Sequence, residues 1–316
     1  MKPVTDELLN YKGISPCPED IDSFWNKSIK EMEQLNFNIS LERAEFIFKN
    51  AEAFHLYFDG VGGSRIHAKY IRPKNATNAP VIFLFHGYSG ESPNWVSLMP
   101  YVCDGFCVAA LDCRGQAGLS EDKGTYIGST YHGHLIRGLK YNNPEKLLFR
   151  QNFLDSAQIV RIIEGFKEVD RERLFTKGVS QGGGLALACA ALSPQIKKAA
   201  VCYPFLSDYS YGWNVAAGGC AYDELKDYFR NFDSRHQRES EIFNCLGYID
   251  IQNIAKRIKA KVLMFTGLMD DVCPPFTQFA VYNKIETEKK VLFYPDYGHE
   301  YLPDSEEIML AWLEEN

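Results

Sequence analysis

A serine between glycines is the residue of this sequence best suited to nucleophilic chemistry. The stretch Gly178-Val-Ser180-Gln181-Gly182 matches the pattern G-x-S-x-G, in which a tight turn between a strand and a helix exposes the serine hydroxyl. Glycines suit the flanking positions because the turn brings backbone against backbone, where a Cβ would clash. The same pattern also suits an ordinary glycine-rich turn, so the assignment of Ser180 as a nucleophile depends on the rest of the chain.

A histidine must accept the serine's proton, because a serine hydroxyl alone is a poor nucleophile. In α/β-hydrolases the order along the chain is Ser, then Asp or Glu, then His, with each group in a loop after a strand. Of the seven histidines, His236 and His299 follow Ser180. His236 lies in a charged stretch and is expected at the surface, whereas His299 follows the apolar segment 290–294. We therefore predict that His299 is the general base.

The histidine in turn needs a carboxylate that orients its ring. Two candidates, Asp270 and Asp271, follow the apolar segment 261–267. Both lie between Ser180 and His299, as the order requires, but the spacing does not separate one from the other.

The negatively charged oxygen of a tetrahedral intermediate needs two backbone N–H donors. The residue after the nucleophile, Gln181, provides the first, and the loop His86-Gly87-Tyr88 provides the second, with the Tyr88 N–H as the candidate. His86 precedes the nucleophile and ends a buried strand. We expect it to orient its loop by hydrogen bonds.

The elements that carry these residues alternate between buried strands and amphipathic helices. Continuous apolar runs, typical of strands buried on both faces of a sheet, occur at 80–85, 106–111, 198–203, 261–267 and 290–294. Helical patterns occur at 93–103, 151–169, 276–286 and 304–315, and before them in a helix that begins near Pro16. Segments 52–58 and 65–72, separated by a glycine-rich turn, predict an antiparallel pair. We predict one α/β-hydrolase domain over residues 1–316, with a mostly parallel sheet and helices on both faces.

Two segments interrupt this alternation. Residues 117–150 are polar, glycine-rich and aromatic without a sustained period, which is typical of a functional or interfacial loop. Residues 206–257 are charged and mostly helical, and we predict that they form an insertion above the sheet.

The composition excludes several classes of partner. A net charge of −7 argues against binding to nucleic acid or to an anionic membrane. The N-terminus lacks a signal peptide and no run of 18 apolar residues occurs, so we expect a cytoplasmic protein without a membrane helix. The nine cysteines lack C-x-x-C spacing, which favours reduced, buried thiols over a zinc site.

Six motifs occur in a fixed order along nearly the whole chain. They are Pro16-Cys-Pro18 to Phe24-Trp25, Arg114-Gly115-Gln116, Gly178-Val-Ser180-Gln181-Gly182-Gly183, Leu246-Gly-Tyr-Ile-Asp250, Gly267-Leu-Met-Asp270 through Pro274-Pro275, and His299-Glu300. Together they resemble carbohydrate esterase family 7, the acetyl xylan esterases and cephalosporin C deacetylases. One departure is Ala117, where this family more often has glycine.

The resemblance implies a serine carboxylesterase that works without metal or organic cofactor. It would remove acetyl groups from O-acetylated sugars, xylo-oligosaccharides or cephalosporin C through an acetyl-Ser180 intermediate. It assigns His299 as the base, Asp270 as the orienting carboxylate, and Tyr88 and Gln181 as the oxyanion donors. The alternatives are another α/β-hydrolase, such as a longer-chain esterase or a peptidase, and a non-catalytic binding protein.

The resemblance also implies roles around the reacting groups. The acyl pocket would be formed by Tyr88, Phe205, Val272 and Leu302, and supporting residues would be Arg114, Gln116 and Glu300. We hypothesise that Arg114 and Glu300 form a charge pair that braces their two loops. The family further implies a hexamer with active sites facing an internal cavity, assembled through the loop 117–150.

Overall fold

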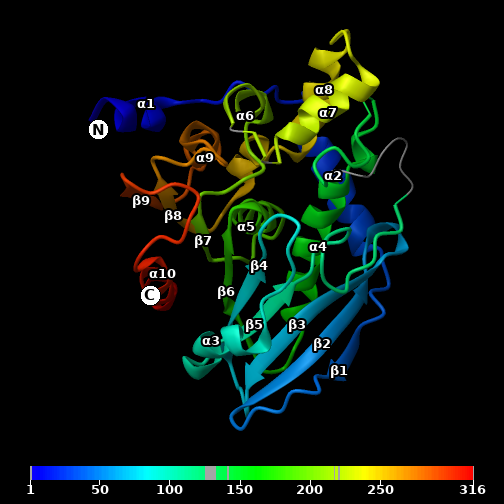
Figure 1. Ribbon diagram of the computed structural model, residues 1–316. Helices are drawn as coiled ribbons and strands as arrows, with labels where there is room; N and C mark the ends of the chain where they lie inside the picture. The colour runs from blue at the N-terminus through cyan, green and yellow to red at the C-terminus, as the bar shows by residue number, and fades with distance from the viewer. Residues whose placement is uncertain (1, 125–132, 141, 217, 220, 316) are drawn as a thin grey trace.

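One nine-stranded sheet organises the part of the chain that the structure describes (Figure 1). This structure is a computed structural model that describes residues 2–124, 133–140, 142–216, 218–219 and 221–315. The strands are β1 (Ser40–Arg43), β2 (Ala51–Asp59), β3 (Arg65–Pro73), β4 (Ala79–Phe85), β5 (Cys107–Leu111), β6 (Val169–Val179), β7 (Lys198–Cys202), β8 (Lys261–Gly267) and β9 (Lys289–Tyr294). Their order in the sheet is β1-β2-β3-β5-β4-β6-β7-β8-β9.

The sheet is parallel from β5 to β9 and antiparallel from β1 to β5. The strands β4, β5, β7 and β8 are buried almost throughout, because helices cover both faces. The predicted α/β-hydrolase architecture is therefore confirmed, as is the antiparallel pair of β2 and β3. Since the parallel strands end at one edge, the loops that follow β4, β6, β8 and β9 meet there.

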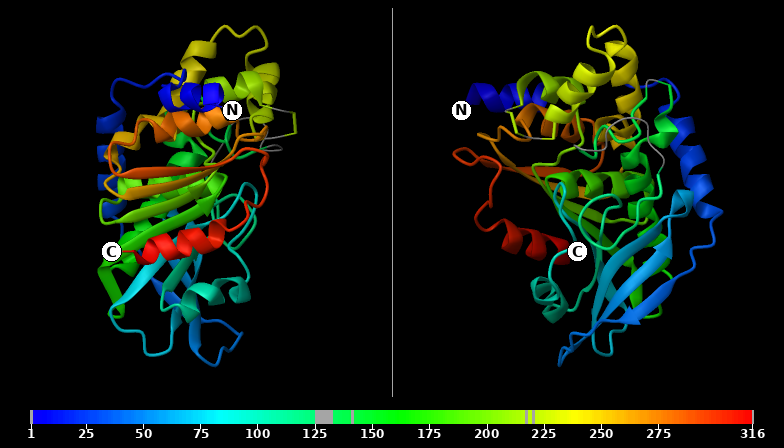
Figure 2. Two further views of the ribbon diagram at one scale, coloured as in Figure 1. Left: turned by 90° about the vertical axis from the view of Figure 1, so that its left-hand side faces the viewer. Right: turned by 45° about the vertical axis from the view of Figure 1, so that its right-hand side comes forward.

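Helices cover both faces of the sheet (Figure 2). They are α1 (Lys2–Asn10), α2 (Ile21–Glu33), α3 (Met99–Cys103), α4 (Leu148–Ile163), α5 (Gln181–Leu192), α6 (Tyr209–Val215), α7 (Asp223–Phe232), α8 (Glu239–Leu246), α9 (Pro275–Tyr282) and α10 (Ser305–Glu314). The larger apolar cluster packs α2, α4, α5 and α9 against one face of the sheet. The smaller cluster packs α3 and α10 against the other. None of the described helices is both long and apolar enough to cross a membrane.

Two predicted helices have different bounds in the structure. The segment 93–103 divides into a 3-10 turn, η2 (Trp95–Leu98), and the short α3, because Pro100 lies in the first turn of α3 and has no N–H to continue the earlier turn. The helix predicted at 151–169 is α4, which begins at Leu148 and ends before Gly165. Residues from Val169 onward belong to the long strand β6, whose first part is exposed and lacks an apolar run.

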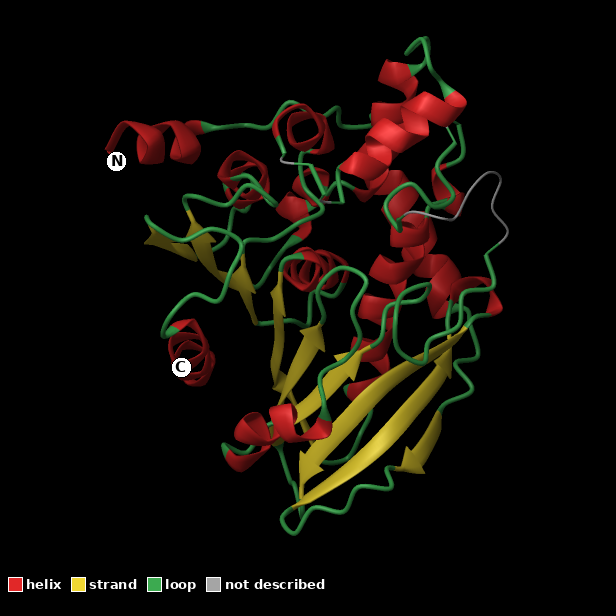
Figure 3. Cartoon of the chain, in the orientation of Figure 1, coloured by secondary structure: helices red, strands yellow, loops and turns green. Residues whose placement is uncertain are grey.

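The predicted insertion lies over the edge where the parallel strands end (Figure 3). It contains α6, α7 and α8, followed by three 3-10 turns, η4 (Gly247–Ile249), η5 (Ile251–Asn253) and η6 (Ala255–Arg257). Of the predicted loop 117–150, residues 125–132 and 141 lie outside the described residues. The described part ends in a 3-10 turn, η3 (Pro144–Lys146), and in the first turn of α4. No disulfide bond joins any two of the eight described cysteines, and Cys220 is not described.

Candidate active site

Ser180 lies at the sharp turn between β6 and α5 with a φ of 57°. A non-glycine residue in this region stores strain of about 1–3 kcal/mol, so the surrounding structure must hold it. The Ser180 N–H donates to the Cys202 carbonyl at 3.0 Å, and the Ser180 carbonyl accepts from the Phe205 N–H at 3.0 Å. A Cβ at Gly178 would overlap the carbonyl of Gly182, and a Cβ at Gly182 would overlap the carbonyl of Phe85, which explains the glycines on both sides of the serine.

A chain of hydrogen bonds joins Ser180, His299 and Asp270. The His299 Nε2 lies 3.0 Å from the Ser180 Oγ, and the His299 Nδ1 lies 2.9 Å from the Asp270 Oδ2. The other carboxylate oxygen, Asp270 Oδ1, accepts from the N–H groups of Val272 at 3.0 Å and Cys273 at 2.7 Å. Asp270 is buried, whereas Asp271 is exposed to solvent. The geometry therefore distinguishes the two aspartates, which their spacing in the sequence did not: Asp270 contacts the His299 ring.

Tyr203 holds the histidine loop in place and was missed by the sequence analysis. Its ring lies against the His299 imidazole, with 4.4 Å between the ring centroids. Its hydroxyl donates to the Glu300 carbonyl at 2.9 Å, and burial raises the pKa of this phenol, so it remains a donor. The feature of the sequence that could have revealed Tyr203 is its position directly after β7, at the edge of the sheet where the other site residues lie. Glu300 itself accepts from the Gly298 N–H at 3.1 Å.

The two candidate oxyanion donors have no protein acceptor among the described residues. The Gln181 N–H belongs to the first turn of α5, where helix geometry provides no acceptor, and the Tyr88 N–H donates to no described residue. The buried Gln181 side chain exchanges two hydrogen bonds with the Gln116 side chain, at 2.8 and 3.0 Å. Gln116 thus links the loop after β5 to the residue that follows the serine.

His86 orients its loop by hydrogen bonds, as expected. Its Nε2 accepts from the Cys113 N–H at 3.0 Å, and its Nδ1 lies 2.8 Å from the Gly87 carbonyl. Burial lowers the pKa of this imidazole, which keeps Nε2 free to accept. The loops after β4 and β5 are therefore joined beside the serine.

The hypothesis of a charge pair between Arg114 and Glu300 is wrong. Arg114 and Asp155 of α4 form a two-point ion pair, with nitrogen–oxygen distances of 2.7 and 2.6 Å. Both side chains are almost fully buried, at 3% and 1% exposure, and a guanidinium removed from water needs a buried carboxylate beside it. Glu300 lies in the histidine loop and its carboxylate accepts from that loop's own backbone.

Three of the four residues predicted for the acyl pocket belong to one apolar cluster. Tyr88, Phe205 and Val272 pack in the larger cluster, and the rings of Tyr88 and Phe205 meet edge to face at 5.8 Å. Leu302 is also buried but packs in the smaller cluster, together with Tyr203.

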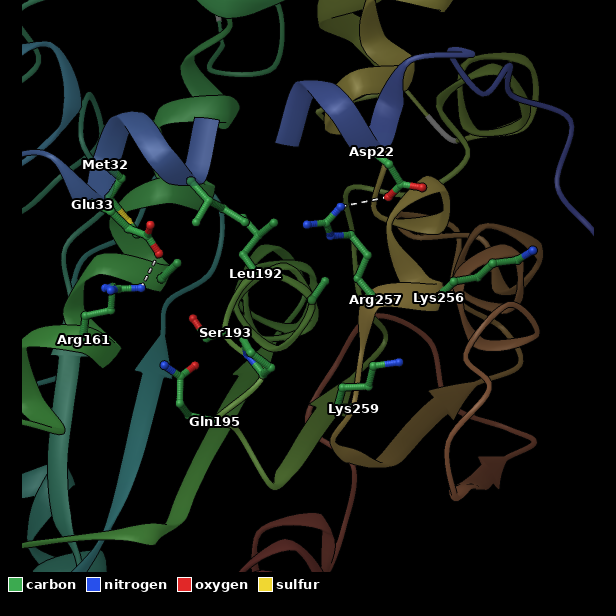
Figure 4. Close-up of a pocket in the computed structure, with 14 residues that line it drawn as sticks. Asp22, Met32, Glu33, Arg161, Leu192, Ser193, Gln195, Lys256, Arg257 and Lys259 are labelled. Carbon is green, nitrogen blue, oxygen red and sulfur yellow. Dashed lines mark hydrogen bonds and ion pairs between the residues drawn. The ribbon is translucent and has the colours of Figure 1, made fainter. Parts of the chain in front are cut away.

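A separate hollow of about 570 Å³ lies at the far end of α5 (Figure 4). It is bordered by Leu192 and by two ion pairs, Arg161 with Glu33 at 2.6 Å and Arg257 with Asp22 at 2.8 Å. A helix of 12 residues, about 18 Å long, separates this hollow from Ser180. It takes no part in the arrangement around the serine.

The sequence matches the acetyl xylan esterase (AXE1) family over residues 3–316. A curated relative, the acetyl esterase Axe7A of Xylanibacter ruminicola, is 25% identical over 97% of this chain and 69% of its own length.

Solved structures agree with this match. The acetyl xylan esterase 1 of Thermoanaerobacterium sp. JW/SL YS485 is 49% identical, with a TM-score of 0.95 over 98% of this chain and 97% of that one. The acetyl xylan esterase of Paenibacillus sp. R4 is 34% identical, with a TM-score of 0.93 over 98% of each chain. The acylaminoacyl peptidase of Pyrococcus horikoshii is 19% identical, with a TM-score of 0.58 over 82% of this chain and 39% of that one, and shares the fold alone.

Proposed function

The chain belongs to the acetyl xylan esterase family and is a carboxylic ester hydrolase, and we propose that it deacetylates O-acetylated sugars through an acetyl-Ser180 intermediate. The observation that carries the proposal is the hydrogen-bonded chain from Ser180 through His299 to Asp270. Such a chain activates a hydroxyl that would otherwise be a poor nucleophile.

The first half of the reaction transfers the acetyl group to the enzyme. The Ser180 Oγ attacks the acetyl carbonyl while the His299 Nε2 takes its proton. Because Nδ1 faces the Asp270 carboxylate, that nitrogen carries the ring proton and Nε2 is free to accept. The negative charge that develops on the carbonyl oxygen is stabilised by the N–H groups of Tyr88 and Gln181, which lack described protein acceptors.

The second half releases acetate. His299 donates its new proton to the departing sugar oxygen, which leaves as a hydroxyl group. Water then gives a proton to the His299 Nε2 and attacks the acetyl carbonyl, and the returning proton regenerates the Ser180 hydroxyl. Each step uses the same two backbone donors, and the protein's own side chains carry every proton in this scheme.

We propose that the acyl pocket formed by Tyr88, Phe205, Val272 and Leu302 favours acetyl over longer acyl groups. The support is the packing of two aromatic rings beside the serine turn, since the Phe205 N–H itself bonds the Ser180 carbonyl. A series of p-nitrophenyl esters tests this. A steep fall in kcat/KM from acetate to butyrate supports the pocket, whereas a flat profile points to a longer-chain esterase.

The names of the relatives favour acetylated xylan or xylo-oligosaccharide as substrate, and cephalosporin C carries the same kind of acetyl ester. Specific activities on acetylated xylo-oligosaccharides, acetylated monosaccharides and cephalosporin C would rank these substrates. Equal activity on all three would contradict a preference for xylan fragments.

We also propose that the protein forms a hexamer, because it resembles a family whose members do. Light scattering of the purified protein gives its mass in solution and distinguishes a hexamer from a monomer.

A further inference from the structure

Glu224 is a buried carboxylate that the reaction scheme does not use, yet it contacts the loop that carries an oxyanion donor. It lies on α7, in the helical insertion, and is 5% exposed. Its Oε1 accepts from the Tyr88 hydroxyl in a short hydrogen bond. A charged side chain is rarely this buried unless hydrogen bonds within the protein offset the free energy of its desolvation.

Three backbone N–H groups also converge on this carboxylate. The Leu135 N–H donates to Oε2 at 2.8 Å, the Ile136 N–H donates to Oε2 at 3.3 Å, and the His134 N–H donates to Oε1 at 3.2 Å. Consecutive N–H groups that point to one side form a natural cradle for an anion. Gly133 comes just before, with a φ of 86°, and a Cβ there would overlap the Glu224 carboxylate.

The same contacts enclose the Tyr88 side chain. Its hydroxyl accepts from the N–H groups of His134 at 2.8 Å and Leu135 at 3.1 Å while it donates to Glu224. The His134 ring lies 5.0 Å from the Tyr88 ring, and the His134 Nε2 lies 2.9 Å from the Ser89 Oγ. The Tyr88 loop is therefore fixed through its side chains as well as through His86.

We propose that Glu224 is a positioning residue for ester hydrolysis: its carboxylate fixes the Tyr88 side chain and so holds the Tyr88 N–H where the oxyanion forms. The inference rests on the proposed roles of Ser180 and Tyr88. An oxyanion donor stabilises the transition state only if its place is fixed before the reaction, and a small displacement removes much of its effect. The insertion thereby has a part in catalysis without contributing a group that touches the substrate.

The first test is Glu224→Gln, which keeps the shape of the side chain but replaces one acceptor oxygen with an NH₂ group that faces N–H donors. We expect kcat on p-nitrophenyl acetate to fall about 10- to 100-fold with KM changed less than about threefold. Asp227→Asn removes a carboxylate from the same helix and is the matched control, with activity close to that of the wild type. Wild-type kcat in Glu224→Gln would overturn the proposal.

A second measurement distinguishes a displaced oxyanion donor from a general loss of protein stability. Methylboronic acid forms a tetrahedral anion on an activated serine, so its binding depends on the same donors. We expect its inhibition constant to rise by about the same factor as kcat/KM falls. A fall in kcat/KM with an unchanged inhibition constant would contradict the role of Glu224 in the oxyanion site.

Two further variants keep the test decisive. If Glu224→Gln does not fold, Tyr88→Phe removes the hydroxyl that Glu224 holds while the Tyr88 N–H is kept, and we expect the same loss of kcat; wild-type kcat would overturn the proposal. Ser180→Ala is measured in parallel. Activity retained in Ser180→Ala would refute the proposed function itself, whereas an inactive Ser180→Ala with an unaffected Glu224→Gln refutes only this inference.

Discussion

The strained backbone of Ser180 shows how single residues define the site. Its positive φ is held by hydrogen bonds to Cys202 and Phe205, and the glycines around it let the chain turn without a clash. The half-buried Ser180 hydroxyl then lies 3.0 Å from the His299 Nε2. The strain of this turn is balanced by the rigid elements on both sides, β6 and α5.

The adjacent residues Asp270 and Asp271 allow a direct test of which carboxylate orients the His299 ring. Asp270→Asn replaces the acceptor of the His299 Nδ1 proton and favours the wrong tautomer, so we expect kcat to fall about 10³- to 10⁴-fold. Asp271→Asn, at the exposed neighbour, should change kcat less than about twofold. The measurement is steady-state hydrolysis of p-nitrophenyl acetate. Equal effects of the two substitutions would contradict the assignment.

The loops around the serine are connected to the helices by buried polar contacts. Arg114 joins the loop after β5 to α4 through Asp155, and its Nη1 donates to the Val61 carbonyl at 2.9 Å. Gln116, two residues later in that loop, bonds Gln181. The ion pair thus fixes the loop that contacts Gln181, one of the two proposed oxyanion donors.

Removal of Arg114 should destabilise the protein strongly. Arg114→Met leaves Asp155 as a buried, unpaired charge, and we expect the free energy of unfolding to fall by about 3–5 kcal/mol. Arg114→Met combined with Asp155→Leu removes both charges and should recover much of that loss. Urea denaturation measures all three proteins. A single variant as stable as the wild type would show that the pair contributes little.

The N-terminal segment is attached to the insertion through two buried aspartates. The Tyr11 hydroxyl donates to Asp208 at 2.6 Å, the Ser15 N–H donates to Asp208 at 2.8 Å, and the Asp208 N–H donates to Asp250 at 3.0 Å. Burial, together with the charge of Asp208, raises the pKa of Asp250 from 3.8 to about 7. In the folded protein this carboxyl therefore binds its proton more tightly than in the unfolded chain.

This shift predicts a pH dependence of stability. Because the folded pKa is raised, the stabilising contribution of Asp250 is complete below about pH 4 and is lost as the pH rises through about 7. Asp250→Asn cannot titrate, so we expect the free energy of unfolding of the wild type to fall relative to that variant between pH 5 and 8. Urea denaturation across this range measures the difference. Parallel curves for the two proteins would contradict the prediction.

Across the whole molecule, the features that could be predicted from the sequence are those set by local patterns and by the order of residues along the chain. The buried strands, the serine turn and the order of Ser180, Asp270 and His299 follow from local patterns, and the family match agrees with the motifs that suggested it. Contacts between distant residues could not be predicted. Arg114 and Asp155 are 41 residues apart, and no periodicity links them. The first part of β6 was missed because its residues 170–173 are all charged, whereas the apolar part before the serine turn was expected as a strand.

Ser180→Ala is the most direct test of the central claim, that Ser180 is the residue acetylated during hydrolysis. We expect the variant to fold like the wild type and to lose hydrolysis of p-nitrophenyl acetate by about 10⁴-fold or more. Mass spectrometry of rapidly quenched wild-type enzyme should find an added acetyl group on the peptide that contains Ser180. Wild-type rates in Ser180→Ala, or an acetyl group on a different residue, would contradict the account.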